Sequence, residues 1–363
     1  MNIAIDIRST LKNRTGIGTY TFGLVNALAK IDRESNYLLY SYVRLFDFKR
    51  RLWRLPGRNF RHKVDRLSFR PDRALKDADV LHTSSYDMPH SVSYGLFTTV
   101  HDLIPLIFPE GYADDYLQKL EGSLKRVFSE SKAIIADSVN TKNDIERSFP
   151  GAAKRIEVVY PGRDESFKAL DKGQSRKKIK DKYGVEGSFL LYSGGMDHRK
   201  NVIRLVEAFE ILKGRHKISH KLVLTGAKGK KTANMENTAK RSGIGKDVIF
   251  TGYVPYDDLK HFYSAADCFV YPSLYEGFGF PILEAFASNV PVVTSSTSSC
   301  GEIASDAAVT VDPSDTEQLS EAIWKVISDR EFACSLAEKG RERAKDFSWE
   351  SSAKHVLELF RGN

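Results

Sequence analysis

The sequence has only three cysteines among 363 residues, and no two of them are spaced as C-x-x-C. An odd number without that spacing excludes a disulfide framework and a thiolate metal site, so we expect a reducing, cytoplasmic environment. Apolar runs such as FLLY at 189–192 are far shorter than the ~18 residues of a spanning helix. The start, MNIAIDIRST, carries charged residues where a secretory signal is apolar, so we expect neither secretion nor membrane spanning.

Acidic residues are the scarcer charge. There are 55 Lys and Arg against 47 Asp and Glu, which gives a net charge of +8 with neutral histidines. The hydrophobic fraction of 41% is typical of a globular protein and excludes disorder. At ~100–200 residues per domain, the length predicts two domains, each with its own core.

Short apolar runs alternate with helical segments along the whole chain. This interleaving is typical of parallel sheets covered on both faces, and it predicts an α/β protein with two doubly wound parallel sheets. The expected strands are IAIDI (3–7), AIIADS (133–138), FLLYSGG (189–195), KLVLTG (221–226), DVIFTG (247–252), CFVYPS (268–273) and VPVVTS (290–295).

A hydrophilic stretch follows the expected strand at 156–162. The stretch DKGQSRKKIKDK (171–182) has too few apolar residues for a core, so we interpret it as a linker with one solvated helix. A final helix near 349–361 has one apolar face, which needs a surface to cover. We therefore expect domains at 1–165 and 166–345, with 346–363 as a last helix that returns to the first domain.

One stretch, residues 44–76, carries more than the whole net charge. It contains twelve Lys or Arg, three Asp and interleaved aromatic residues. A solvated, mobile surface and an anionic membrane surface both fit this pattern. Nucleic acid fits less well, because no sequence-reading motif accompanies the charge.

The segment PSLYEGFGFPILEAFASNVPVVTS (272–295) is the most informative one. Glu276 leaves a predicted strand, and Gly277 and Gly279 allow the backbone to approach a ligand. Glu284 falls in the first turn of the helix that we expect next. Such a loop suits a phosphate or sugar oxygen, and the two carboxylates suit hydroxyl groups. The alternative is a glycine bend before a helix that an acidic residue stabilises.

This segment resembles the E-x7-E signature of the retaining, nucleotide-sugar-dependent glycosyltransferases of family 4, also called group 1. Residues 252–288 follow that family's pattern nearly throughout. The resemblance implies the GT-B arrangement, in which two Rossmann-like domains face each other across a cleft. It also implies that Glu276 contacts the transferred sugar, that Glu284 holds the ribose, and that Gly277, Phe278 and Gly279 contact the donor.

Other segments agree with the family in order along the chain. SGGMDHRKN (193–201) resembles the loop that holds the donor diphosphate, here through Arg199 and Lys200, with Gly194 and Gly195 as backbone contacts. Two cations just before a helix form a reasonable diphosphate clamp. Without the rest of the resemblance, the segment would favour a basic solvated turn.

The glycine loop RTGIGTYTFGL (14–24) resembles the family's loop that approaches the donor phosphate, through Gly16 and Gly18. Its next glycine is Gly23, so the dinucleotide fingerprint G-x-G-x-x-G is not met. A nicotinamide-dependent oxidoreductase, which also has paired Rossmann-like halves, is therefore disfavoured.

Two polar residues follow predicted strands. His101 in TTVHDLIP matches the family histidine that contacts the donor hexose, and Ser138 in ADSVNTKNDI lies near the cleft in the family pattern. Each has a structural alternative: a histidine that ends a strand often only forms a hydrogen bond, and Ser138 could cap a helix.

Two other patterns look like metal sites. Asp77-Ala78-Asp79 is a literal D-x-D, but it precedes a predicted strand, so we interpret it as a turn. His216 and His220 have helical spacing without an intervening carboxylate, which makes zinc improbable. We expect no metal and no other cofactor.

The base pocket should be lined by residues near Gly252, Tyr253 and Val254, which carry no readable code for the base. The pattern of the first half resembles members that use GDP-mannose in surface-polysaccharide assembly. We therefore predict a metal-independent, retaining hexosyltransferase, with a glycan or lipid-linked oligosaccharide as acceptor and a peripheral place at the inner membrane face.

Three alternatives stay open. The donor could be UDP-glucose or another UDP-sugar. The chain could be a GT-B sugar-nucleotide epimerase, which needs no acceptor. A non-catalytic polyanion-binding protein would explain the basic stretch but would leave both glutamates and the Arg199–Lys200 loop without a role.

Overall fold

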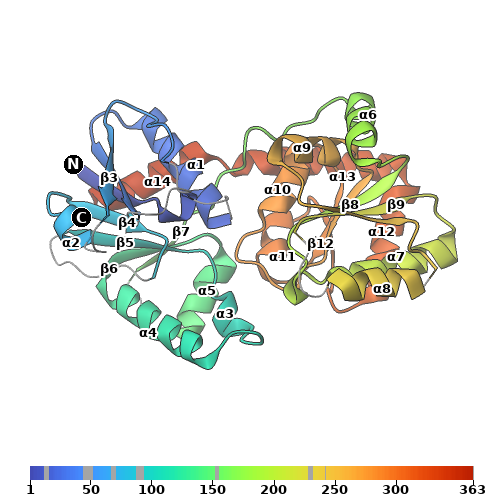
Figure 1. Cartoon of the computed structure of the whole chain (residues 1–363), viewed down its shortest axis with the longest axis horizontal. Coiled ribbons are helices and arrows are strands. Elements are labelled where there is room, and N and C mark those ends of the chain that lie inside the picture. Colours follow the sequence, from blue (N-terminus) through green and yellow to red (C-terminus); the bar gives the residue numbers. More distant parts are fainter. Residues whose placement is uncertain are drawn as a thin grey trace. The chain divides into compact units, whose positions relative to one another are not determined.

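A computed structural model describes residues 1–11, 16–43, 52–66, 71–86, 94–151, 155–227, 232–241 and 243–362. The chain forms two compact units (Figure 1). The first unit comprises Met1–Gly162 together with Phe347–Asn363, and the second comprises Arg163–Asp346.

The first unit is built on a seven-stranded sheet of order β3-β2-β1-β4-β5-β6-β7, in which every paired strand is parallel. The central strands are buried along nearly their whole length, as expected for a sheet covered on both faces. The strands are β1 (Asn2–Asp6), β2 (Asn36–Tyr42), β3 (Phe60–Asp65), β4 (Val80–Thr83), β5 (Gly95–Val100), β6 (Ser131–Ala136) and β7 (Ile156–Val158).

The helices of the first unit follow its strands in the chain, except for the last one, which comes from the carboxyl terminus. They are η1 (Arg8–Thr10), α1 (Gly16–Ile31), α2 (Pro71–Ala74), α3 (Ile104–Ile107), α4 (Asp114–Glu130), α5 (Val139–Ser148) and α14 (Trp349–Arg361).

Helix α14 packs against α1, and its apolar face joins the core of the first unit. Phe360 is 1% exposed and packs edge-on against Phe97, with ring centroids 5.0 Å apart. The ring of Trp349 lies against Gly23, where a Cβ atom would come within 2.2 Å of it. The apolar face expected for the last helix therefore covers α1 and part of the first sheet.

The second unit is built on a six-stranded, wholly parallel sheet of order β10-β9-β8-β11-β12-β13. Its strands are β8 (Phe189–Ser193), β9 (Lys221–Thr225), β10 (Val248–Gly252), β11 (Cys268–Tyr271), β12 (Val292–Ser295) and β13 (Val309–Val311). The two parallel α/β sheets confirm the predicted fold class.

Helices surround this second sheet, and several of them begin at an aspartate that accepts a backbone N–H, as expected of N-caps. They are α6 (Lys172–Tyr183), η2 (His198–Lys200), α7 (Val202–His216), α8 (Thr232–Arg241), α9 (Tyr256–Ala265), α10 (Phe280–Ala287), α11 (Ser298–Ala304), α12 (Thr316–Ser328), α13 (Arg330–Arg343) and η3 (Ala344–Asp346).

The helix expected within 171–182 is present as α6, but the interpretation of this stretch as a linker is wrong. These residues form α6, which packs on α9 within the second unit. Ile179 is buried, and Arg176 donates two hydrogen bonds to the Asp267 carboxylate, at 2.9 and 3.1 Å. The low apolar content misled the prediction, because ion pairs and one buried isoleucine are enough to dock a helix whose other face is solvated.

Within the described part of the chain, no helix is long and apolar enough to cross a membrane.

The packing of α14 predicts that Phe360→Ala destabilises the first unit. Removing a fully buried phenylalanine leaves a cavity and costs about 3–5 kcal/mol. Urea unfolding followed by tryptophan fluorescence measures this loss, since Trp53 and Trp349 both lie in the first unit. Glu358→Ala, on the exposed side of the same helix, should change the free energy of unfolding by less than about 0.5 kcal/mol. An equal effect of both substitutions would contradict the described packing.

Candidate functional site

The strongest cluster of polar side chains in the second unit lies at the carboxyl ends of β8 and β11. These strands are neighbours in the sheet, and the chain order reverses between them. Ligands of open parallel sheets bind at such a switch point. The loop after β8 carries Arg199 and Lys200, and the loop after β11 carries Ser273 and Glu276.

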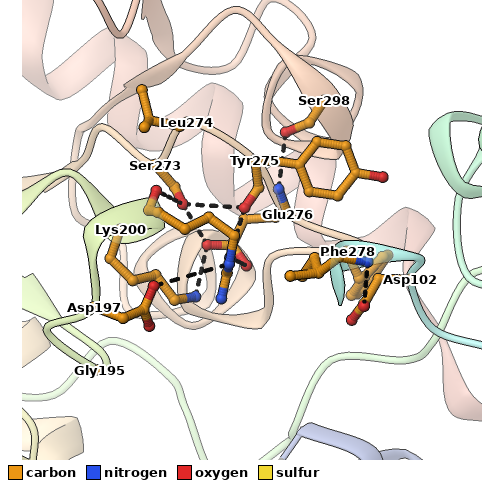
Figure 2. Close-up of polar contacts among 12 residues, drawn as sticks. Asp102, Gly195, Asp197, Lys200, Ser273, Leu274, Tyr275, Glu276, Phe278 and Ser298 are labelled. Atoms are coloured by element: carbon orange, nitrogen blue, oxygen red, sulfur yellow. Dashed lines mark hydrogen bonds and ion pairs between the residues drawn. The ribbon is translucent and has the colours of Figure 1, made fainter. Parts of the chain in front are cut away.

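Glu276 is the centre of this cluster, and Figure 2 shows Lys200 and Ser273 pointing toward its carboxylate. Lys200 Nζ lies 2.6 Å from Oε1, and Arg199 Nη1 lies 2.9 Å from Oε2. The hydroxyls of Ser273 and Tyr271 also donate to Oε1, at 2.5 and 3.0 Å. The Glu276 carboxylate, in the loop after β11, thus binds two cations from the loop after β8, one through each oxygen.

The electrostatics of the cluster follow from this pairing. Burial alone would raise the pKa of Glu276, but Lys200 and Arg199 hold it below its usual value. Burial opposes the charge of Arg199, while Glu276 and Asp197 raise its pKa. Glu276 is only 7% exposed, yet the two cations keep its carboxylate ionised. The exposed Asp197 lies 3.9 Å from Arg199 Nε, so two carboxylates balance the two cations, and an anionic ligand would be bound by their charge-assisted hydrogen bonds.

Backbone hydrogen bonds join the two loops. The N–H of Leu274 donates to the carbonyl of Arg199 at 2.8 Å, and Arg199 Nη1 donates to the carbonyl of Tyr275 at 2.6 Å. Asn201 has a φ of 57° and donates through Nδ2 to the carbonyls of Pro272 and Pro313. These bonds hold the cations in one place before any ligand arrives.

The segment after Glu276 is held from the side of α11. The N–H of Glu276 donates to Ser298 Oγ at 3.1 Å, and Ser299 Oγ donates to the carbonyls of Glu276 and Phe278. Gly279 is the residue before α10 and has a φ of 117°, which only glycine adopts readily. The predicted donor loop of Gly277, Phe278 and Gly279 is therefore a tightly anchored bend.

Glu284 does not lie in the first turn of its helix, as the sequence analysis expected. Helix α10 begins at Phe280, which places Glu284 in the second turn. Its carboxyl group accepts hydrogen bonds from Tyr263 at 2.8 Å and Tyr256 at 3.3 Å. Burial raises the pKa of Glu284 to about 7, although these hydroxyls lower it in part.

The remaining predicted donor contacts of the second unit also lie at carboxyl ends of its strands. Gly194 follows β8 with a φ of 154°, and its carbonyl would be 1.8 Å from a Cβ atom at Gly226. At the end of β10, Tyr253 is 76% exposed whereas Val254 is buried. Gly195 and Gly252, predicted with them, follow β8 and end β10.

In the first unit, the two predicted glycines open a helix instead of forming a free loop. Gly16 begins α1 and is exposed, with open space where a Cβ atom would be. Gly18 lies in the first turn of α1 and is buried, and a Cβ atom there would be 2.8 Å from the carbonyl oxygen of Ser9. Gly18 thus permits close packing of α1 on η1. Residues 12–15 lie outside the described chain.

His101 and Ser138 follow the neighbouring strands β5 and β6. His101 Nδ1 lies 2.5 Å from Asp137 Oδ2, and both side chains are buried. Burial opposes protonation, but Asp137 raises the pKa of His101 above its usual value. Ser138 is fully buried and accepts a hydrogen bond from the N–H of Thr141 as the cap of α5. The capping alternative for Ser138 therefore holds, and its contact with the donor stays a prediction.

Both suspected metal patterns have structural explanations. Asp79 accepts the N–H of Asn2 at 2.7 Å in the connection before β4. His216 stacks on Trp324 with ring centroids 4.1 Å apart, and His220 lies 3.9 Å from Asp267. Among the residues that the structure describes, no group of three or more His, Cys, Asp or Glu could hold a metal ion.

The sequence analysis missed the partners of the predicted residues. Tyr271, Ser273 and Tyr263 bind the two glutamates, and Asp137 binds His101. Asp137 carries a signal in the sequence, because it lies at the end of the predicted strand AIIADS (133–138), where ligand-binding residues gather in parallel sheets. The tyrosines carry none, since each lies in a strand or helix where an aromatic residue is usually part of the core.

Two family models match consecutive parts of the chain. The model "Glycosyltransferase Family 4" matches residues 14–167, and the model "Glycosyl transferases group 1" matches residues 175–343. Among curated proteins, the chain is similar to O-antigen chain mannosyltransferase B of Escherichia coli. The two are 28% identical over 96% of each chain.

Solved structures that share the fold of this chain include a synthase and a complex with a nucleotide. Sucrose-phosphate synthase from Thermosynechococcus elongatus superposes with a TM-score of 0.79 at 20% identity, covering 99% of this chain and 98% of that one. Anabaena Alr3699/HepE in complex with UDP and glucose superposes with a TM-score of 0.76 at 15% identity over the whole of both chains.

The surroundings of Glu284 predict a pH-dependent stability. A carboxyl group with a pKa of about 7 in the folded state and a lower one when unfolded stabilises the fold only while it is protonated. Its contribution is complete below the unfolded pKa near 4.5 and is lost as the pH rises through 7. Relative to wild type, Glu284→Gln should therefore gain stability between pH 5 and pH 8, by about 1–3 kcal/mol.

Thermal unfolding at a series of pH values measures this difference. Glu338→Gln serves as the control, because Glu338 is exposed on α13 and should follow wild type at every pH. A gap between Glu284→Gln and wild type that does not change with pH would show that Glu284 is ionised throughout.

Proposed function

Because the chain belongs to the group 1 glycosyltransferases of family 4, which have the GT-B fold, we propose that it is a retaining hexosyltransferase acting in cell-surface polysaccharide assembly. Our preferred donor is GDP-mannose, and our preferred acceptor is a glycan or a lipid-linked oligosaccharide. The observation that carries this proposal is the ion-paired cluster of Arg199, Lys200 and Glu276 at the switch point of the second sheet.

In the proposal, Arg199 and Lys200 neutralise the donor's diphosphate. When the sugar leaves, negative charge grows on the phosphate oxygen that bonded to it. One well-placed donor to a growing anion lowers a barrier by about 2.7–4 kcal/mol. The two cations and the hydrogen bonds that fix their loops support this role, and the proposal assigns no metal to it.

Glu276 then stabilises the positive charge that develops at the anomeric carbon. Its two oxygens are already engaged by Lys200 and Arg199, so we do not assign it the role of a covalent nucleophile. We propose a front-face displacement with retention, in which the acceptor oxygen forms its bond to the anomeric carbon as the phosphate departs. The leaving phosphate takes the acceptor's proton.

The donor's identity is supported by relatives alone. The similar Escherichia coli protein is a mannosyltransferase of the O-antigen chain, which favours mannose and a surface polysaccharide. The Anabaena structure was solved with UDP and glucose, which keeps a UDP-sugar as the alternative donor. Glu284 is proposed to hold the ribose in either case, since both nucleotides carry the same sugar. A sugar-nucleotide epimerase differs by needing no acceptor.

Residues 1–165 are proposed to bind the acceptor and 166–345 the donor. His101 is proposed to contact the hexose from the first of these domains, with Gly16 and Gly18 near the phosphate. A cytoplasmic location at the inner face of the membrane stays a prediction.

Part of the basic stretch 44–76 supports contact with an anionic membrane, although 44–51 and 67–70 lie outside the described residues. Leu52 and Leu55 are exposed. Trp53 is not free to insert, because its Nε1 donates to Thr10 Oγ1 at 2.9 Å. The exposed cations of the described part are Arg54, Arg58, Arg61, Lys63, Arg66, Arg73 and Lys76.

The enzyme proposal predicts transfer from a sugar nucleotide in the presence of EDTA. A panel of GDP- and UDP-sugars, followed by nucleotide release and by product analysis with a glycan acceptor, measures the reaction. Glu276→Gln should lower turnover by about 10²–10³-fold, because it removes the charge that stabilises the transition state. Glu338→Gln should keep wild-type turnover.

Equal turnover of Glu276→Gln and wild type would contradict the role of Glu276. Binding of polyanions without transfer from any donor of the panel would instead support the non-catalytic alternative. Conversion of the sugar nucleotide without an acceptor would support the epimerase.

Membrane contact is tested by vesicle flotation. Wild-type protein should bind vesicles that contain anionic lipid, and binding should fall as salt rises. The triple charge reversal Arg58→Glu, Arg61→Glu and Lys63→Glu should weaken binding at least about 100-fold, since each cation near the surface contributes about 1 kcal/mol.

The control reverses three exposed lysines of the second unit, Lys168, Lys177 and Lys217, and so changes the net charge equally. If both triple variants lose the same affinity, the attraction is a property of the net charge and the proposed surface is wrong.

A further inference from the structure

The first unit holds a buried pair of titratable groups, His101 and Asp137, that the cluster around Glu276 does not include. His101 and Asp137 come from the carboxyl ends of adjacent parallel strands, where Val100 pairs with Ala136 in the register of β5 and β6. The register therefore places the two side chains next to each other. His101 Nδ1 lies 2.5 Å from Asp137 Oδ2, so the imidazole and the carboxylate are hydrogen-bonded.

One polar atom of each side chain has no hydrogen-bond partner among the described residues. His101 Nε2 and Asp137 Oδ1 are buried and bind no group among the described residues. Leaving a buried polar atom unpaired costs about 1–3 kcal/mol. Buried polar atoms usually have a hydrogen-bond partner, so an unpaired Nε2 beside a paired Nδ1 supports a ligand at this nitrogen.

The ring of His101 is fixed from several sides. Tyr20 of α1 packs edge-on against it, with centroids 4.8 Å apart and an interplanar angle of 74°. Thr141 of α5 donates to the carbonyl of His101 at 3.2 Å. The Asp137 carboxylate only accepts hydrogen bonds, so Nδ1 carries a proton and Nε2 is the ring atom that points away from the pair.

We infer that Asp137 is a positioning residue, which holds His101 with Nδ1 protonated and its Nε2 presented to the hexose or phosphate of the donor. The inference rests on the proposed function for the identity of that ligand. Loss of the Asp137 carboxylate leaves the imidazole free to rotate or to change tautomer, as happens when the aspartate of a Ser-His-Asp triad is replaced by asparagine.

The charged and titratable groups near His101 decide its protonation. They are Asp137 after β6, Asp102 beside it, His82 of β4, and Tyr20 and Tyr86. His82 stays neutral, because burial lowers its pKa to about 3. Without the Asp137 carboxylate, burial and His82 would together disfavour a charged His101. The pH limb on which His101 loses its proton should therefore move to lower pH in the variant.

The test uses Asp137→Asn in the full-length protein. We expect kcat to fall about 10- to 100-fold, the worth of one hydrogen bond to a charged group. The donor KM should change less than about threefold, and the alkaline limb of the pH profile should shift downward. Asp144→Asn is the matched control: Asp144 is also buried, and it pairs with Arg147 on α5. It should keep wild-type kcat and pH profile if it folds.

A second measurement needs neither a variant of Asp137 nor activity. Imidazole ¹⁵N spectra of wild-type protein, with the His101 signal assigned through His101→Gln, should show a protonated Nδ1 in a strong hydrogen bond. Addition of a sugar nucleotide should change the environment of Nε2 and not that of Nδ1. An unprotonated Nδ1, or an Asp137→Asn enzyme with wild-type kcat and pH profile, would overturn the inference. If wild type transfers no sugar while its spectra are as expected, the proposed function fails and the pairing stands.

Discussion

The second unit depends on one carboxylate that binds two cations from another loop. Glu276 leaves β11 and binds Arg199 and Lys200, which leave β8. Without this carboxylate, two buried cations would repel each other and turn toward solvent. Without the cations, burial would neutralise Glu276. Each partner therefore holds the other in place, and we propose that the two cations together bind an anionic ligand.

The same design recurs in the first unit on a smaller scale. Asp137 follows β6 and His101 follows β5, and again a carboxylate at one strand end holds a basic side chain at the end of the neighbouring strand. Both pairs use a property of parallel sheets: all carboxyl ends meet at one edge, so residues far apart in sequence become neighbours there. The glycines at these strand ends allow close backbone approach, as between Gly194 and Gly226.

Much of this could be read from the sequence, and the failures have physical reasons. Short, continuous apolar runs between helical segments predicted both sheets. Strands that are buried on both faces are apolar at successive positions, so they stand out in the sequence. The E-x7-E segment located Glu276, but the sequence could not show that Arg199 and Lys200 bind it, since that contact depends on which strands are adjacent. Glu284 was expected in the first turn of its helix, but α10 already begins at Phe280, so Glu284 falls in the second turn. The helix at 171–182 was expected, but its packing within the second unit was not, since ion pairs to Asp267 leave no apolar pattern.

The central claim is that Arg199 and Lys200, held by Glu276, bind the diphosphate of a sugar nucleotide without a metal. Calorimetric titration of wild type and of Lys200→Ala with GDP-mannose and UDP-glucose in EDTA tests it most directly. The account predicts that wild type binds one of these donors, and that the variant binds it at least about tenfold more weakly, the worth of one charge-assisted hydrogen bond. Equal affinity of the two proteins, or binding only after magnesium is added, would contradict the account.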